Sequence, residues 1–159
     1  MKDVDSLDLE PIIIKGMDAD EGYGWTQPLG LQVAAEYLKY LWLCRMYPDA
    51  DMVPSGIVDD FWHLHILDTR KYAEDCQTYF GYFLHHFPYF GMRGEEDKQY
   101  LADAWVSTLN RYRVHFGEPP ADLWIGSRRC PNCGRRCKDA SASQREKRPS
   151  FESLRNFTP

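Results

Sequence analysis

The chain has 159 residues, of which 43% are hydrophobic and 14% are aromatic, and its formal net charge is −5. This length and composition exclude a disordered chain and predict one globular domain, with or without a tail, whose core needs no disulfides. No segment is long and apolar enough to span a membrane. Near the N-terminus, acidic residues precede an apolar run that is too short for a signal peptide. We therefore expect a cytoplasmic protein without a membrane partner.

Helical periodicity dominates the chain, and no convincing strand pattern accompanies it. A short helix over 5–10 should end at Pro11, and a long helix should run over 29–47, between Pro28 and Pro48. A second long helix is expected over 56–80, ending at Gly81, and a third over 95–116. The predicted fold is therefore all-α, with three main helices joined by long connectors rich in aromatic residues. Trp105 and Trp124 are expected in the core.

Charge divides the chain into an acidic body and a basic tail. Residues 1–125 contain 10 Lys and Arg against 21 Asp and Glu, a net charge of −11, whereas residues 126–159 contain 9 against 3, a net charge of +6. We therefore expect a helical domain over 1–126, a cysteine-rich segment over 127–139 and a basic, flexible tail over 140–159. The tail either only aids solubility or docks on an acidic partner, on nucleic acid or on the body of the same chain.

Four of the five histidines fall within residues 61–88. If 56–80 is one regular helix, His65, Asp68 and Cys76 share its apolar face, whereas Asp59 and His63 lie on the opposite face, where we expect His63 to be a surface residue in a charged neighbourhood. The adjacent His85 and His86 follow in the connector, where an extended backbone would direct them to opposite sides.

Two interpretations of this cluster remain open. In the structural one, His65, Asp68, Thr69 and Tyr72 form hydrogen bonds with one another and with the His85–His86 connector. In the metal-site one, His65 and one of the connector histidines bind zinc, iron or copper, with Asp68 or Cys76 as a further ligand. Catalysis by a Cys76 nucleophile is the weakest alternative, because no local signature supports it.

The same stretch resembles the bacterial form of the glycine-rich domain-containing protein-like family, over residues 30–125. The family pattern reads V-D-x-x-W-H-x-H-x-L-x-T, then Tyr, Cys, Phe-Gly and His-His-x-Pro. It falls on Val58, Asp59, Trp62, His63, His65, Leu67, Thr69, Tyr72, Cys76, Phe80, Gly81, His85, His86 and Pro88. The resemblance implies no agreed catalytic activity, but it places both His63 and His65 in the motif, so His63 is not dismissed on geometric grounds.

The segment RRCPNCGRRCKD provides Cys130, Cys133 and Cys137. C-P-x-C-G is typical of a zinc knuckle, in which a tight turn directs two thiolates at one ion. Because only Cys137 follows, a fourth ligand has to come from elsewhere, for example His115, another cysteine, a second chain or water. A free redox-sensitive tail and an iron–sulfur cluster are the alternatives.

These observations favour a metal-binding helical protein, which could be an enzyme. The second hypothesis is an interaction module without catalysis, with a structural histidine cluster and a zinc-knuckle tail that binds a protein partner. Nucleic acid is a weaker candidate partner, because the net charge of the body is −11.

Overall fold

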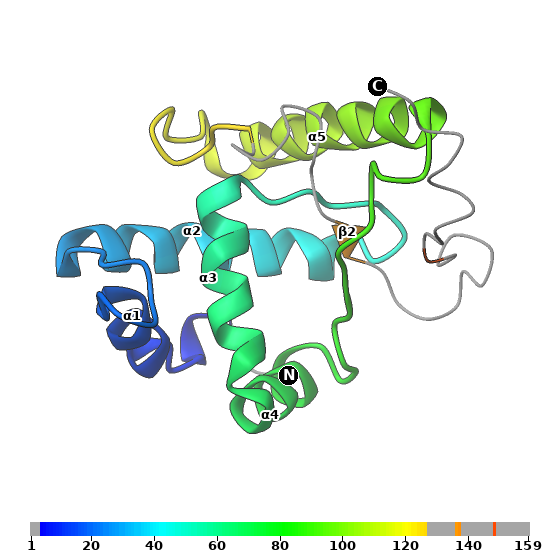
Figure 1. The fold of residues 1–159 in the computed structure, drawn as a ribbon. Helices are drawn as coiled ribbons and strands as arrows, with labels where there is room; N and C mark the ends of the chain where they lie inside the picture. Colours follow the sequence, from blue (N-terminus) through cyan, green and yellow to red (C-terminus); the bar gives the residue numbers. More distant parts are fainter. Residues whose placement is uncertain (1–3, 127–135, 138–147, 149–159) are drawn as a thin grey trace. The chain divides into compact units, whose positions relative to one another are not determined.

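The computed structural model describes residues 4–126, 136, 137 and 148, and its regular structure is almost entirely helical (Figure 1). The prediction of an all-α fold is confirmed, with five α-helices among the described residues instead of three main ones. The chain forms two compact units: one contains residues 1–47 and 57–83, and the other contains residues 48–56 and 84–159. No helix in the described part of the chain is long and apolar enough to cross a membrane.

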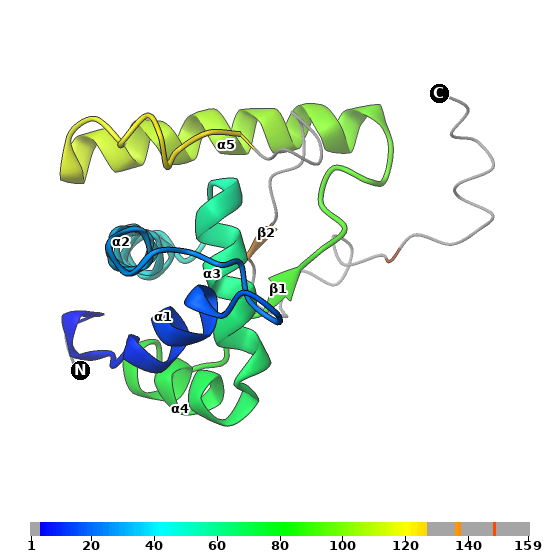
Figure 2. The same ribbon diagram turned by 60° about the vertical axis from the view of Figure 1, so that its left-hand side comes forward.

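The first unit begins with a single 3₁₀ turn at Val4–Ser6 and helix α1 at Glu10–Met17. The expectation that Pro11 ends a helix is wrong: Pro11 lies in the first turn of α1, where proline's missing N–H costs no hydrogen bond. Helix α2, Gln27–Met46, lies beside α1 (Figure 2). Gly30 permits this contact, because a Cβ atom there would lie 2.9 Å from a methyl carbon of Ile13.

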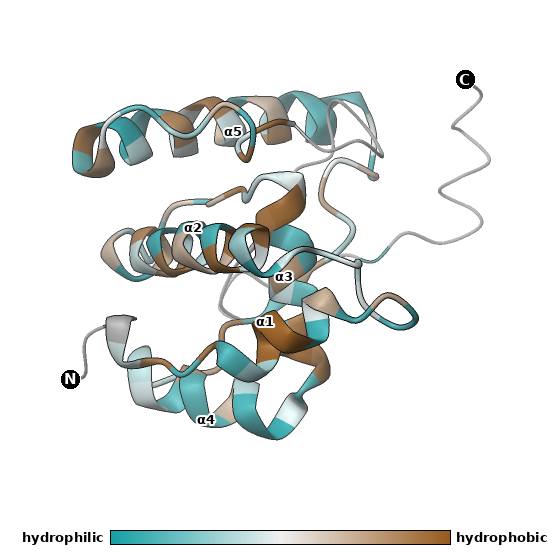
Figure 3. Cartoon of the chain, turned by 90° about the vertical axis from the view of Figure 1, so that its left-hand side faces the viewer, coloured by the Kyte–Doolittle hydropathy of each residue, from teal (hydrophilic) through white to brown (hydrophobic). Residues whose placement is uncertain are grey.

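Two shorter helices complete the first unit: α3 at Gly56–Leu67 and α4 at Thr69–Tyr79. Hydropathy colouring shows α1 as largely hydrophobic and α4 as largely hydrophilic (Figure 3). The largest buried side chains of this unit are aromatic, namely Tyr37, Tyr40, Phe61, Trp62, Tyr72 and Tyr79. The core is therefore rich in rings that also carry hydroxyl or N–H groups, and each of these polar groups needs a partner.

The second unit is built on helix α5, Glu95–Phe116, which ends at Gly117 with a positive φ of 79°. Its core cluster contains Val53, Phe90, Leu101 and Ala104, with Phe87 and Trp105 packed against it. Trp124 is buried, as predicted, and stacks on the half-buried Trp105 at 5.9 Å between ring centroids.

The strands of the second unit are two residues long. Strand β1, His86–Phe87, pairs antiparallel with β2, Arg136–Cys137, so that His86 lies opposite Cys137 and Phe87 lies opposite Arg136. This pairing connects the aromatic connector to the cysteine-rich segment through backbone hydrogen bonds.

Candidate metal and hydrogen-bonding sites on α3 and α4

The prediction of a single helix over 56–80 is wrong, because the chain breaks at Asp68 into α3 and α4. Asp68 is the N-cap of α4: its side chain accepts a hydrogen bond of 3.3 Å from the backbone N–H of Lys71. Aspartate is a preferred N-cap because its carboxylate satisfies an N–H group that the first turn leaves without a helical partner. Asp68 is exposed in this position, so the structure gives it a capping role and does not place it beside His65 as a ligand.

His65 is buried, and both nitrogens of its ring have hydrogen-bond partners. Nδ1 lies 3.0 Å from the Tyr37 hydroxyl, and Nε2 lies 2.9 Å from a carboxylate oxygen of Asp75, which also pairs with Lys71 at 2.9 Å. Because a carboxylate only accepts, Nε2 donates to Asp75 and Nδ1 accepts from Tyr37. The lone pair that a metal would need on His65 is therefore already used within the unit.

Burial lowers the pKa of His65 below its ordinary value, and the nearby Asp75 opposes that shift without overcoming it. The ring is consequently neutral near pH 7, in agreement with the direction of its two hydrogen bonds. The break at Asp68 is what brings α4 back toward α3, so that a carboxylate ten residues after His65 reaches its ring. Sequence reasoning missed Asp75 because a straight helix would not present it to His65.

Aromatic side chains enclose this network. The indole N–H of Trp62 donates a hydrogen bond of 2.9 Å to the Tyr72 hydroxyl, and the Tyr72 ring meets the His65 ring edge-on at 5.0 Å between centroids. Cys76 is a buried thiol on α4, and Thr69 is the exposed first residue of that helix. This arrangement orients His65 rigidly, as in the structural interpretation, although most of its partners differ from those expected.

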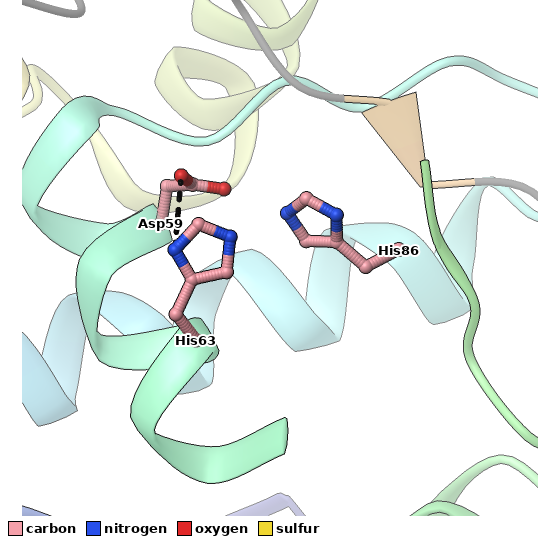
Figure 4. Close-up of side chains that lie close together, drawn as sticks. All are labelled: Asp59, His63 and His86. Atoms are coloured by element: carbon pink, nitrogen blue, oxygen red, sulfur yellow. Dashed lines mark ion pairs between the residues drawn. The ribbon is translucent and has the colours of Figure 1, made fainter. Parts of the chain in front are cut away.

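Asp59 and His63 form a second site on α3. They are separated by four residues, and Figure 4 shows both side chains projecting from the same helix, with an ion pair of 3.8 Å between Oδ2 of Asp59 and Nδ1 of His63. The Asp59 side chain is only 7% exposed and the His63 side chain is 32% exposed. His63, which was expected at the surface, is thus only partly exposed, and the carboxylate on the same face of the helix is buried.

The distance between these two atoms is informative. At 3.8 Å it exceeds the range of a hydrogen bond. Two ligands bound to one zinc ion at about 2.1 Å, with tetrahedral angles, lie roughly 3.4 Å apart. A small adjustment of the His63 ring would therefore allow both residues to bind one ion, and the (i, i+4) spacing was the sequence signal that could have found this pair.

The connector histidines differ in exposure: His85 is exposed, whereas His86 is half-buried in β1. Of the cysteine-rich segment, Cys130 and Cys133 lie outside the described residues, and Cys137 is described as a strand position in β2. The predicted zinc knuckle and the predicted flexible tail over 140–159 thus remain predictions.

A protein-family model described as UCP032817-like matches residues 22–118 of the chain, a range that includes α2, α3, α4, α5 and both connector histidines. Comparisons with curated proteins and with solved structures found no match.

Proposed function

The chain belongs to the UCP032817-like family, and we propose that it binds a divalent transition-metal ion through Asp59 and His63 of α3 and through His86 of the connector. The observation that carries the proposal is the Asp59–His63 pair, in which a buried carboxylate and an imidazole lie at nearly the separation of two ligands on one ion. A bound cation would also offset the cost of burying the Asp59 charge.

His86 is preferred over His85 as the third ligand. His86 is half-buried, whereas His85 is exposed, and Asp59, His63 and His86 belong to one group of residues that could hold a metal ion. Both histidines follow the WHLH motif in the family-like pattern, so the motif alone does not choose between them. One carboxylate and two imidazoles are a donor set that suits zinc or iron(II).

This proposal revises the ligand set expected from the sequence. His65 is assigned to the hydrogen-bond network with Tyr37 and Asp75, and Asp68 is assigned to capping α4. The tail cysteines, a zinc knuckle formed by them and a protein partner for the basic tail stay predictions, as does the relation to the glycine-rich domain-containing protein-like family.

The test is metal content by mass spectrometry, measured on tag-free full-length protein purified without added metal and again after dialysis against zinc or iron(II). We expect about one ion per chain at this site, and we expect Asp59→Asn, His63→Ala and His86→Ala each to lose it. Far-ultraviolet circular dichroism would establish that each variant remains helical.

Two matched controls sharpen the result. Asp60→Asn changes the neighbouring carboxylate, which accepts a hydrogen bond from Tyr23, and His85→Ala changes the neighbouring connector histidine. Both should retain the ion, and so should His65→Gln, in which the glutamine can hydrogen-bond in place of the ring. Unchanged metal content in folded His63→Ala protein, or loss of metal in His85→Ala alone, would contradict the proposed ligand set.

A further inference from the structure

Aromatic rings connect the surface of the first unit to its fully buried Tyr37. The exposed Tyr23 stacks on the half-buried Trp25 at 4.9 Å between ring centroids, with 13° between the ring planes. Trp25 lies parallel to Phe61 at 6.3 Å, and Phe61 contacts the Tyr37 ring at 5.1 Å. Rings at these separations provide short steps for electron transfer, so an electron can leave Tyr37 although no substrate can reach it.

The surface end of this chain of rings is fixed by helix α1. The backbone N–H groups of Tyr23 and Trp25 both donate hydrogen bonds of 3.1 Å to the Gly16 carbonyl oxygen. Gly16 also makes room for the indole, because a Cβ atom at this position would lie 2.6 Å from a ring carbon of Trp25. The Tyr23 hydroxyl donates a hydrogen bond of 3.2 Å to Asp60 of α3. The stacked pair is therefore held in the geometry that electron transfer between the rings needs.

The inner end of the chain of rings is a tyrosine with its own proton acceptor. The Tyr37 hydroxyl donates to Nδ1 of His65 at 3.0 Å, and Nε2 of the same ring donates to Asp75 at 2.9 Å. A general base has to lie about 2.6–3.2 Å from the group whose proton it takes, and Nδ1 meets this requirement. Because Tyr37 is fully buried, its hydroxyl cannot attack a substrate. The chemistry left to it is loss of a proton and an electron by separate routes.

We infer that Tyr37 is a redox-active tyrosine, which loses its electron along this chain of rings and its proton to His65. A one-electron oxidant of the class of peroxide-derived radicals first takes an electron from Trp25, which becomes a radical cation. An electron from Tyr37 then restores neutral Trp25. As it leaves, the O–H bond of Tyr37 breaks and an N–H bond forms at Nδ1 of His65, which gives a neutral tyrosyl radical and an imidazolium. This direction is favourable, because a tyrosine that can release its proton is oxidised more readily than a tryptophan.

The charges around His65 suit an imidazolium that forms only transiently. Asp75 accepts from Nε2, and its negative charge and that of Asp68 favour the imidazolium, whereas Lys71, which shares the Asp75 carboxylate, opposes it. Burial nevertheless lowers the pKa of His65 below its ordinary value. The proton is therefore held weakly and returns to Tyr37 when a one-electron donor such as a thiolate reduces the radical. None of these residues is a ligand in the proposed metal site, so the inference is independent of it.

Flash oxidation provides the test. Tag-free full-length protein purified with zinc, which has no redox chemistry of its own, would be illuminated with ruthenium tris-bipyridine and persulfate. Samples frozen at increasing delays would be examined by electron paramagnetic resonance. Radicals on exposed tyrosines decay quickly by reaction with other molecules, so we expect the wild type to show, in addition, a tyrosyl radical that outlasts them. Tyr37→Phe, which removes only the hydroxyl, should lose this long-lived signal, and a wild type without it would overturn the inference.

Tyr40→Phe is the matched control, because Tyr40 is another fully buried tyrosine of α2, and this variant should keep the long-lived signal. His65→Gln tests the proton acceptor: an amide oxygen can accept the Tyr37 hydrogen bond but cannot take up the proton. The long-lived signal should therefore disappear from His65→Gln while circular dichroism shows an intact helical fold. An unchanged signal in Tyr37→Phe or in folded His65→Gln would overturn the inference.

A measurement on the wild type alone needs no substitution to fold. If a proton moves together with the electron, the long-lived radical should form more slowly in D₂O than in H₂O. Equal rates of formation in the two solvents would overturn the proton transfer from Tyr37 to His65.

Discussion

Replacing His65 by alanine should destabilise the protein strongly without removing metal, because the structure gives this ring a hydrogen-bonding role. The ring is 1% exposed and links the Tyr37 hydroxyl to the Asp75 carboxylate. Removing it leaves the fully buried Tyr37 hydroxyl without this partner, which costs on the order of 1–3 kcal/mol. Loss of the edge-on contacts with the Tyr37 and Tyr72 rings adds about 0.5–1.5 kcal/mol each.

Asp75 adds little to this cost, because its side chain is 17% exposed and keeps its ion pair with Lys71. The total expected loss is therefore about 2–6 kcal/mol, which is a large share of the roughly 5–15 kcal/mol of a typical domain. Urea unfolding followed by tryptophan fluorescence and circular dichroism would measure the loss, provided that both probes report the same transition.

His63→Ala is the comparison variant, measured in the absence of metal. In the wild type, the His63 side chain is 32% exposed and lies 3.8 Å from its Asp59 partner. We therefore expect the substitution to change the free energy of unfolding by about 1 kcal/mol or less. Unfolding of His65→Ala at the same urea concentration as the wild type would refute a stabilising role for the ring. Loss of metal from folded His65→Ala as complete as from His63→Ala would show that His65 is needed for metal binding after all.

Three further predictions follow from individual contacts. Asp68→Ala should lower the free energy of unfolding, measured in urea, by about 1 kcal/mol, because α4 loses its N-cap. Asp68→Ser should keep most of the wild-type stability, because serine is also a good N-cap. Equal effects of the two variants would exclude capping as the cause. Gly30→Ala should lower the free energy of unfolding by about 1–3 kcal/mol, because the new Cβ would lie 2.9 Å from an Ile13 methyl carbon. In a double-mutant cycle, adding Ile13→Val should recover part of this loss. Removing bound metal with a chelator should lower the melting temperature of the wild-type protein but not that of His63→Ala, because an ion bound only by the folded state stabilises that state.

The long helices could be predicted from the sequence because their determinants are local. Apolar residues at helical spacing run between Pro28 and Pro48 in α2, and Gly117 ends α5 at a positive φ that glycine adopts without strain. These signals depend on residues within a few positions of each helix end. The observed helices, Gln27–Met46 and Glu95–Phe116, accordingly lie close to the predicted ranges.

The break at Asp68 was harder to predict, since aspartate is tolerated inside helices as well as preferred at their starts. An unbroken helix would keep the apolar faces of α3 and α4 in line, and the capping hydrogen bond to Lys71 competes with that arrangement. Burial of aromatic side chains from both helices, including Trp62 and Tyr72, favours the bent form. That burial depends on residues distant in sequence and not on the local pattern.

In the candidate sites too, local sequence predicts some features and tertiary packing decides the others. The sequence by itself determined that histidine, aspartate and cysteine gather within residues 58–88, and the (i, i+4) spacing of Asp59 and His63 already placed both on one helix face. Only the tertiary structure decided that this face is buried at Asp59, and that His65 uses both ring nitrogens on Tyr37 and Asp75. The physical reason is that helical spacing specifies which residues share a face, whereas burial and hydrogen-bond partners depend on what packs against that face.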